Sequence, residues 1–203
     1  MMRKDLFAEK SKHWDMNSKR VQGAKSIADT IIKNISLIKE MHLMDFGAGT
    51  GLLSYCLSEK IGKITAVDNS PSMLEVFHEK SEDFFCPTEV LEMDFTTETF
   101  PQNTQFDGII SSMTIHHVED TELMLKKMYA LLPKNGFIAL ADLDKEKGDF
   151  HSDNTGVFHF GFEREKLGDL AKKVGFREVK FHNANTIKKP HANYEVFLLT
   201  AQR

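Results

Sequence analysis

The chain has 203 residues, of which 41% are hydrophobic, and its formal net charge at pH 7 is −4. This length suits one α/β domain with a sizeable core, and the acidic balance argues against a nucleic-acid partner. No apolar run approaches the roughly 18 residues of a membrane-spanning helix and no signal peptide opens the chain, so we expect a cytoplasmic protein without a membrane partner.

Predicted strands alternate with predicted helices after residue 40, which indicates a mostly parallel sheet covered on both faces. Helices are expected at about 17–36, 51–60, 71–82, 119–132 and 163–174, and strands at about 41–46, 63–67, 88–93, 105–111, 135–142, 176–185 and 193–201. Ser70 before Pro71 is typical of a helix start, and Gly175 of a helix end. The helix expected at 17–36 carries an apolar stripe that would pack on the sheet.

The strand expected at 41–46 leads into a turn with glycine at alternate positions, Gly47, Gly49 and Gly51. A side chain at these positions would keep a ligand away from the backbone. Asp45 ends the strand, where we expect it to face the same crevice. An acid at this place suits a ligand with a positive group better than a pyrophosphate.

Two further acids end the next two predicted strands. Asp68 follows 63–67 at about 17–20 residues from the glycine turn, the range in which an acid hydrogen-bonds ribose hydroxyls in nucleotide-binding α/β units. Asp94 follows 88–93. Because the carboxyl ends of parallel strands meet at one edge of a sheet, three acids in this pattern indicate a nucleoside site more strongly than the glycine turn alone.

These motifs resemble those of class I S-adenosylmethionine-dependent methyltransferases over about residues 40–145. The run Asp-Phe-Gly-Ala-Gly-Thr-Gly at 45–51 is similar to the first motif of the family. Val-Asp-Asn-Ser at 67–70 is similar to the second, and Met-Asp-Phe at 93–95 to the adenine-binding motif.

The resemblance is strongest to the type-11, ubiquinone/menaquinone-methyltransferase-like branch. Residues 106–117 resemble its fourth-strand motif, 131–137 the turn before strand five, and 7–15 its entry segment. It implies a Rossmann-like doubly wound sheet of seven strands, mostly parallel with an antiparallel final strand, and helices on both faces. Within a single domain over 1–203 we expect an N-terminal lid and helix at 1–36, a cofactor-binding core at 40–145, and an acceptor-side insertion with a C-terminal hairpin at 146–203.

The resemblance implies S-adenosyl-L-methionine as cofactor and S-adenosyl-L-homocysteine as product. Asp45 would bind the ammonium, directly or through water, Asp68 both ribose hydroxyls and Asp94 the adenine amine, since a carboxylate accepts several hydrogen bonds. Helix capping is the alternative role for Asp45 and Asp68, and core packing for Met73. The expected cofactor-binding residues are Asp45, Gly47, Gly49, Gly51, Asp68, Asn69, Ser70, Met73, Asp94, Phe95 and Ser111.

Methyl transfer is an in-line displacement at a sulfonium carbon, so the main task is to hold the acceptor about 3–3.5 Å from the methyl group. A general base is needed only if the acceptor must lose a proton. His116, directly after the fourth strand, is the candidate base, and a structural histidine is the alternative. The residues expected in a lid or acceptor pocket are Trp14, His117, His151, His159 and Phe160. We expect no metal, because the spacing of Asp142, Asp144 and His116 matches no known ligand set.

Other functions fit the residues less well. Nicotinamide dehydrogenases space their glycines as G-x-G-x-x-G, whereas here the third glycine comes one position early. The Asn/Asp-Pro-Pro-aromatic stretch of base-amino methylases and the Pro-Cys pair of cytosine-carbon methylases are both missing. We therefore expect an enzyme that methylates a small molecule. A non-catalytic S-adenosylmethionine-binding sensor or partner-binding module is the alternative, and the acceptor and the oligomeric state stay open.

Overall fold

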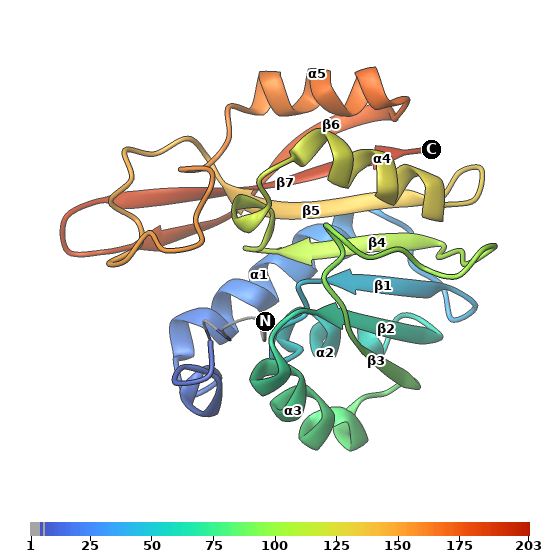
Figure 1. Cartoon of the computed structure of the whole chain (residues 1–203), viewed down its shortest axis with the longest axis horizontal. Coiled ribbons are helices and arrows are strands. Elements are labelled where there is room, and N and C mark those ends of the chain that lie inside the picture. The colour runs from blue at the N-terminus through green and yellow to red at the C-terminus, as the bar shows by residue number, and fades with distance from the viewer. Residues whose placement is uncertain (1–4, 6) are drawn as a thin grey trace.

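The computed structural model describes residue 5 and residues 7–203, so part of the expected lid, residues 1–4 and 6, lies outside the described residues. The described chain forms a seven-stranded sheet in the order β3-β2-β1-β4-β5-β7-β6 (Figure 1). The strands are β1 (His42–Phe46), β2 (Lys63–Asp68), β3 (Thr88–Glu92), β4 (Gly108–Ser112), β5 (Phe137–Leu143), β6 (Arg177–Lys188) and β7 (Asn193–Gln202). Only β7 runs antiparallel to its neighbours among these strands, which confirms the predicted fold.

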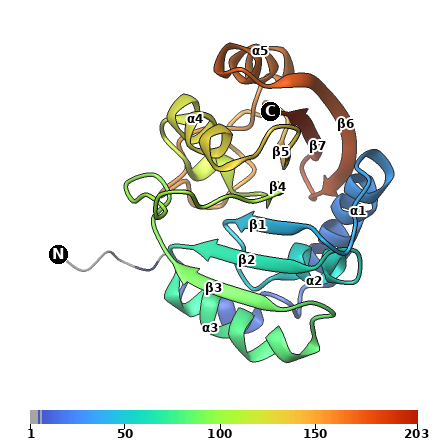
Figure 2. The ribbon, with the colours of Figure 1, turned by 90° about the vertical axis from the view of Figure 1, so that its right-hand side faces the viewer.

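Helices cover both faces of the sheet (Figure 2). On one face lie α1 (Ser18–Asn34), α2 (Leu52–Ser58) and α3 (Pro71–Lys80), and on the other α4 (Thr121–Leu131) and α5 (Arg164–Val174). Short 3-10 turns are η1 (Ser11–His13), η2 (Ser81–Asp83) and η3 (Ile115–His117). The helix expected to run to residue 82 changes to this tighter geometry after Lys80, and the strand expected from 105 begins only at Gly108. No helix in the described part of the chain has the length and apolar character to cross a bilayer.

Local side chains fix where the helices begin. Asn17 and Ser70 each accept a hydrogen bond from backbone N–H groups of the following first turn, and Pro71 occupies the first helical position of α3. Asp120 caps α4 in the same way. Gly175, with φ of 121°, ends α5 as expected.

The core lies in two layers, one on each face of the sheet. The first layer joins α4 and α5 to the sheet through Met44, Ile109, Met124, Leu125, Ile138, Leu140, Leu167 and Phe197. The second joins α1 and α2 to the opposite face through Ile27, Ile31, Leu43, Leu53, Leu57, Ile64, Ile110 and Leu198. Because both faces are packed, the carboxyl edge of the parallel strands is the part of the sheet left for a ligand. At that edge Figure 1 shows the ends of β1 and β4, the segment before α1 and the loop between β5 and α5.

Candidate functional site

The turn between β1 and α2 has the backbone that its glycines predict. Gly47 and Gly49 have φ of 67° and 54°, in the left-handed region that favours glycine. A Cβ on Gly47 would overlap the Thr114 side chain, which follows β4. A Cβ on Gly49 would meet nothing within 4 Å. Gly47 is therefore required for packing, whereas Gly49 borders a space that a ligand can enter.

Asp68 connects this turn to the start of α3. Its Oδ2 accepts a hydrogen bond from the Gly49 N–H at 2.8 Å, and its Oδ1 accepts one from the Ser70 N–H at 2.9 Å. Burial raises the pKa of Asp68 above its ordinary value, and the backbone N–H groups of Gly49, Ser70 and Asn69 partly offset that rise. Each carboxylate oxygen can accept a second bond, so Asp68 still has room for two hydroxyl donors.

Asp45 lies beneath the glycine turn rather than facing the crevice as we expected. It is only 1% exposed, and its Oδ2 accepts a hydrogen bond from Ser54 Oγ of α2 at 2.6 Å. Burial raises the pKa of Asp45 to about 7, and the nearby Asp68 carboxylate adds to the rise. In this arrangement an ammonium could reach Asp45 only through an intervening group such as a water molecule.

The residues expected around adenine are held by their own local contacts. Asp94 Oδ1 accepts from the Thr96 backbone N–H and hydroxyl, at 3.0 and 2.6 Å. Met73 and Phe95 are 3% and 2% exposed, so both side chains pack in the core. These positions offer backbone groups, and the Asp94 carboxylate, to a ligand more readily than apolar side chains.

Ser111 and Asn69 complete the predicted cofactor-binding set. Ser111 is fully buried, and its hydroxyl donates to the Phe46 carbonyl at 2.7 Å. This bond holds the ends of β4 and β1 together beside the glycine turn. Asn69 is exposed, directly after Asp68.

On the other side of the glycine turn, His116 of η3 forms a buried pair with Asp142 of β5. His116 Nδ1 and Asp142 Oδ1 lie 2.8 Å apart, and the two residues are 1% and 0% exposed. The His116 backbone N–H also donates to Asp142 Oδ2, at 3.2 Å. Sequence reasoning considered Asp142 only as a metal ligand and missed this pairing.

Two further imidazoles pack against His116. The ring centroids of His117 and His151 lie 4.1 and 5.0 Å from that of His116. Burial, with a smaller effect of the neighbouring imidazoles, lowers the pKa of His117 and brings that of His151 to about 4. Among the described residues no group of three or more potential ligands is arranged to hold a metal ion.

Two residues expected in the acceptor pocket lie outside this cluster. His159 Nε2 contacts the Val118 carbonyl at 2.9 Å, at the start of the segment leading to α4. Phe160 is 37% exposed. The backbone of this loop still contacts η3, because the His159 N–H donates to the His116 carbonyl at 3.2 Å. That His159 and Phe160 line the acceptor pocket therefore stays a prediction.

The segment before α1 contacts both ends of the predicted cofactor site. Asp5 accepts hydrogen bonds from the hydroxyls of Ser70 and Ser72 at the start of α3, at 2.9 and 2.7 Å. Asp15 accepts one from the Thr50 hydroxyl in the glycine turn, at 2.6 Å. These contacts hold the described part of the segment beside the crevice.

Aromatic contacts tie the same segment to the histidine cluster. The Phe7 ring lies 5.9 Å from Trp14 and 6.0 Å from His117, edge to face in both cases. The Arg20 guanidinium lies over Trp14, 3.8 Å from the ring. Trp14 thus anchors the segment through Phe7 and Arg20, and Phe7 rather than Trp14 contacts the cluster.

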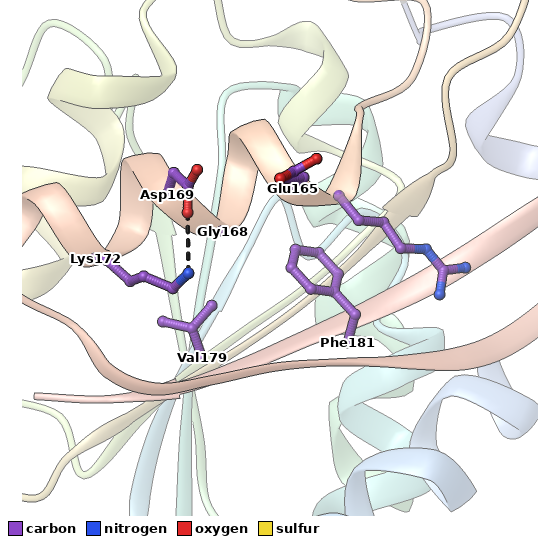
Figure 3. Close-up of a pocket in the computed structure, with 7 residues that line it drawn as sticks. Glu165, Gly168, Asp169, Lys172, Val179 and Phe181 are labelled. Carbon is purple, nitrogen blue, oxygen red and sulfur yellow. Dashed lines mark hydrogen bonds and ion pairs between the residues drawn. The ribbon is translucent and has the colours of Figure 1, made fainter.

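A separate hollow of about 220 Å³ lies between α5 and β6 (Figure 3). On its rim Lys172 Nζ lies 2.9 Å from Asp169, and Val179 and Phe181 form its floor. The hollow is smaller than typical small-molecule pockets, which begin at about 300 Å³, and it holds none of the residues described above. We therefore assign the site to the carboxyl edge of the sheet.

Comparison with known proteins gives the family of the chain. A family model described as "Methyltransferase domain" matches residues 44–140. An uncharacterized methyltransferase of Schizosaccharomyces pombe is 31% identical over 81% of this chain and 61% of its own length. Phosphoethanolamine N-methyltransferase 1 of Zea mays is 26% identical over 77% of this chain and 32% of its own length. The ubiquinone biosynthesis O-methyltransferase of Pelagibacter ubique is 29% identical over 59% of this chain and 51% of its own length. The chain thus spans between about a third and three fifths of these relatives.

Solved structures share the fold. A methyltransferase of Haloferax volcanii, in complex with the Trm112 methyltransferase activator, has a TM-score of 0.76 at 15% identity and covers 100% of this chain and 99% of its own. Phosphoethanolamine N-methyltransferase 2 of Haemonchus contortus, solved with S-adenosyl-L-methionine, has a TM-score of 0.70 at 16% identity and covers 100% and 60%. At these identities the likeness is one of architecture.

Proposed function

The chain belongs to the class I S-adenosylmethionine-dependent methyltransferases, and from this membership we propose that it transfers a methyl group from S-adenosylmethionine to a small-molecule acceptor. The membership confirms the resemblance read from the sequence. Two relatives carry the names of phosphoethanolamine and ubiquinone-biosynthesis enzymes, which supports an acceptor of small-molecule size.

The observation that carries the proposal is the juxtaposition of Gly49 and Asp68. The space beside Gly49 is open to a ligand, and the Asp68 carboxylate that binds the Gly49 N–H has acceptor capacity to spare. The residues present therefore fit a nucleoside with free ribose hydroxyls. Asp68 would hold the ribose and Asp94 the adenine amine, while the glycine backbone would lie against the methionine portion.

Positioning is the main contribution that the protein makes to this reaction. The bound cofactor supplies an activated methyl group on a positively charged sulfur. Thr114, held by its hydrogen bond to the Gly47 carbonyl at 3.2 Å, and the buried His116 then border the side from which an acceptor approaches. The segment around Phe7 would reduce the access of water from this side, which favours a step in which charge on sulfur is lost.

Titration calorimetry tests the proposal. We expect S-adenosylmethionine and S-adenosylhomocysteine to bind, and NAD to give no heat of binding. Purified chain incubated with a metabolite extract and donor carrying a labelled methyl group should also produce a labelled small molecule, detected by mass spectrometry. Binding of NAD in place of both nucleosides would contradict the proposal. Binding without any labelled product would favour the sensor function instead.

Proton release on cofactor binding is a second expected result. The raised pKa of Asp45, about 7, means that the free protein carries a proton there at about pH 6.5 for most of the time. A cofactor ammonium near Asp45 would favour the carboxylate and expel that proton. Calorimetry at about pH 6.5 in buffers of different ionisation enthalpy should show the release, and Asp45→Asn should abolish it. Equal proton release in both proteins would remove Asp45 from the ammonium site.

The same shift has a consequence for folding. A carboxyl group with a raised pKa in the folded state keeps a proton that the unfolded chain loses above about pH 4. The free energy of unfolding should therefore decrease as the pH rises from about 4 to about 7, and stay level above that. Urea unfolding of the Asp45→Asn variant should lack this decrease.

A further inference from the structure

The His116–Asp142 pair leaves one imidazole nitrogen buried without a partner. In the tautomer that pairs with an ionised Asp142, His116 Nδ1 carries the proton between the two side chains and Nε2 carries a lone pair. His116 Nε2 is enclosed, and it has no hydrogen-bond partner among the described residues. Because a buried acceptor without a donor is unfavourable, this atom points to a donor that a ligand would bring.

The surroundings of His116 carry little free charge. Both Asp142 oxygens are occupied, because Oδ1 also accepts from the Leu143 N–H at 2.7 Å and Oδ2 from the His116 N–H. His117 and His151 have pKa values below the ordinary value of histidine. At neutral pH the His116–Asp142 pair therefore lies next to uncharged imidazole rings.

The two cations nearest to those rings are turned to other partners. Lys189 Nζ donates to the Phe150 carbonyl and lies over the Phe150 ring, at 4.0 Å from its centroid. Lys10 lies over the Phe7 ring at 5.8 Å. Among the residues that the structure describes around these rings, there is thus neither a free cation for a phosphate nor a free carboxylate for an ammonium.

We propose that His116 is the general base of the reaction, that Asp142 positions it, and that the acceptor is a neutral molecule methylated on an aromatic or enolic hydroxyl. This inference rests on the proposed function. A hydroxyl oxygen is a weak nucleophile until it loses its proton, so it gains most from a base. An amine attacks as its neutral form, and its ammonium form would need a carboxylate that this site does not offer.

The hydroxyl proton passes to His116 Nε2 while the oxygen forms a bond to the methyl carbon. The bond between that carbon and sulfur breaks, and sulfur keeps the electron pair and becomes neutral. Asp142 stabilises the imidazolium that results, and the ring later returns its proton to water. The rings of Phe7 and Phe150, which contact His117 and His151, provide apolar surroundings for an aromatic acceptor.

The first test uses 4-nitrophenol, whose anion absorbs at longer wavelength than its neutral form, with the wild-type chain saturated with S-adenosylhomocysteine. If His116 takes the proton, bound 4-nitrophenol should ionise at least about one pH unit below its midpoint in free solution. The neutral amine 4-nitroaniline should compete poorly. Failure of 4-nitrophenol to bind, or binding in its neutral form, would overturn the inference.

The second test compares His116→Gln with His182→Gln, a matched change on β6 where the imidazole contacts Thr200. The His116 variant should lose the anion band and about 100-fold or more in turnover, while its affinity for S-adenosylhomocysteine is kept. Asp142→Asn should lower turnover less and shift the pH profile. If the His116→Gln protein retains the band of the 4-nitrophenol anion, His116 is not the general base. If that variant does not fold, the spectrum of 4-nitrophenol bound to the wild-type chain decides.

Different results would refute the proposed methyltransferase function and the proposed hydroxyl acceptor. A wild-type chain that binds neither S-adenosylmethionine nor S-adenosylhomocysteine refutes the proposed function and this inference with it. A chain that binds S-adenosylhomocysteine but leaves 4-nitrophenol unbound or neutral refutes only the hydroxyl acceptor and its base.

Discussion

Alanine at position 47 is expected to lower the free energy of unfolding by about 3 kcal/mol or more, and alanine at position 49 by only about 1 kcal/mol. Both glycines have positive φ, so both variants pay a similar backbone strain. The difference arises because the new methyl group at 47 would overlap the Thr114 side chain, whereas at 49 it would enter open space. Urea unfolding followed by circular dichroism measures both values.

Thr114 has little freedom to move away from an alanine at 47. Its hydroxyl donates to the carbonyls of Gly47 and Ser112, both at 3.2 Å, and the preceding Met113 has a positive φ of 57°. A non-glycine residue in that region is uncommon outside functional loops. The clash would therefore spread into the loop that leads to η3. Equal destabilisation by the two alanines would show that backbone strain alone explains these glycines.

The Gly49→Ala variant also tests where the cofactor binds. If the space beside Gly49 receives the methionine portion of the cofactor, then Gly49→Ala should fold nearly normally and yet bind S-adenosylhomocysteine at least about tenfold more weakly. A stable Gly49→Ala protein with unchanged affinity would place the cofactor elsewhere along the edge.

The sheet and the cofactor side of the site could be predicted because their signals are local. The glycine turn, Asp68 and Asp94 each follow a strand directly, and the parallel order of those strands brings them to one edge without any knowledge of loops. Strand and helix ends were shifted by only a few residues. The burial of Asp45 could also have been predicted. Asp45 lies two residues after Leu43 and therefore on the same face of β1, which α1 and α2 cover.

The acceptor side could not be predicted in the same way. His116 and Asp142 are 26 residues apart, and they meet because β4 and β5 pair in a register that sets Ser112 beside Ala141. The chain then turns back through η3, and no periodicity in the sequence predicts this turn. The loop at 144–162 has no repeating pattern either, so His151, whose ring joins the cluster, could not be distinguished by sequence from His159, whose ring does not.

The N-terminal contacts share this difficulty. Asp15 reaches Thr50 across 35 positions, and Asp5 reaches Ser72 across 67. Hydrogen bonds of such long range depend on how the segment is packed, and a polar residue in an irregular segment carries no sign of its partner. The sequence therefore predicted that the segment before α1 lies near the site, but only the structure shows which residues hold it there.

Replacing Asp68 by alanine is expected to weaken S-adenosylhomocysteine binding by about 3 kcal/mol, or more than 100-fold. The carboxylate would make two charge-assisted bonds to the ribose hydroxyls, each worth about 1.5–3 kcal/mol. The variant also loses the bonds to the Gly49 and Ser70 N–H groups, which lie 2.8 and 2.9 Å from the carboxylate and fix both sides of the crevice. Calorimetry gives the affinity, and urea unfolding gives the separate loss of stability.

Asp107→Ala is the matched control for this variant. Its Oδ2 accepts the His42 N–H at 2.8 Å at the opposite end of β1, so its removal also leaves a backbone donor without its carboxylate. Both alanines should therefore lower stability, the change at 68 by more because it leaves two backbone donors and not one, while only that change should lower affinity. Equal losses of affinity would mean that general loosening of β1 explains the effect, and unchanged affinity in the Asp68 variant would exclude it from the ribose site.

Asp68→Asn separates the two roles of the carboxylate further. The amide keeps the shape of the side chain and one acceptor oxygen, so it can retain one of the two backbone bonds. Its NH₂ group must then face the other backbone N–H, donor against donor, and it can no longer accept from a ribose hydroxyl. The remaining oxygen can still accept one hydroxyl, so affinity should fall by about the value of one of the two ribose bonds while more of the stability is kept than in the alanine variant. That divergence between affinity and stability is what a ligand-binding carboxylate, as opposed to a purely structural one, has to produce.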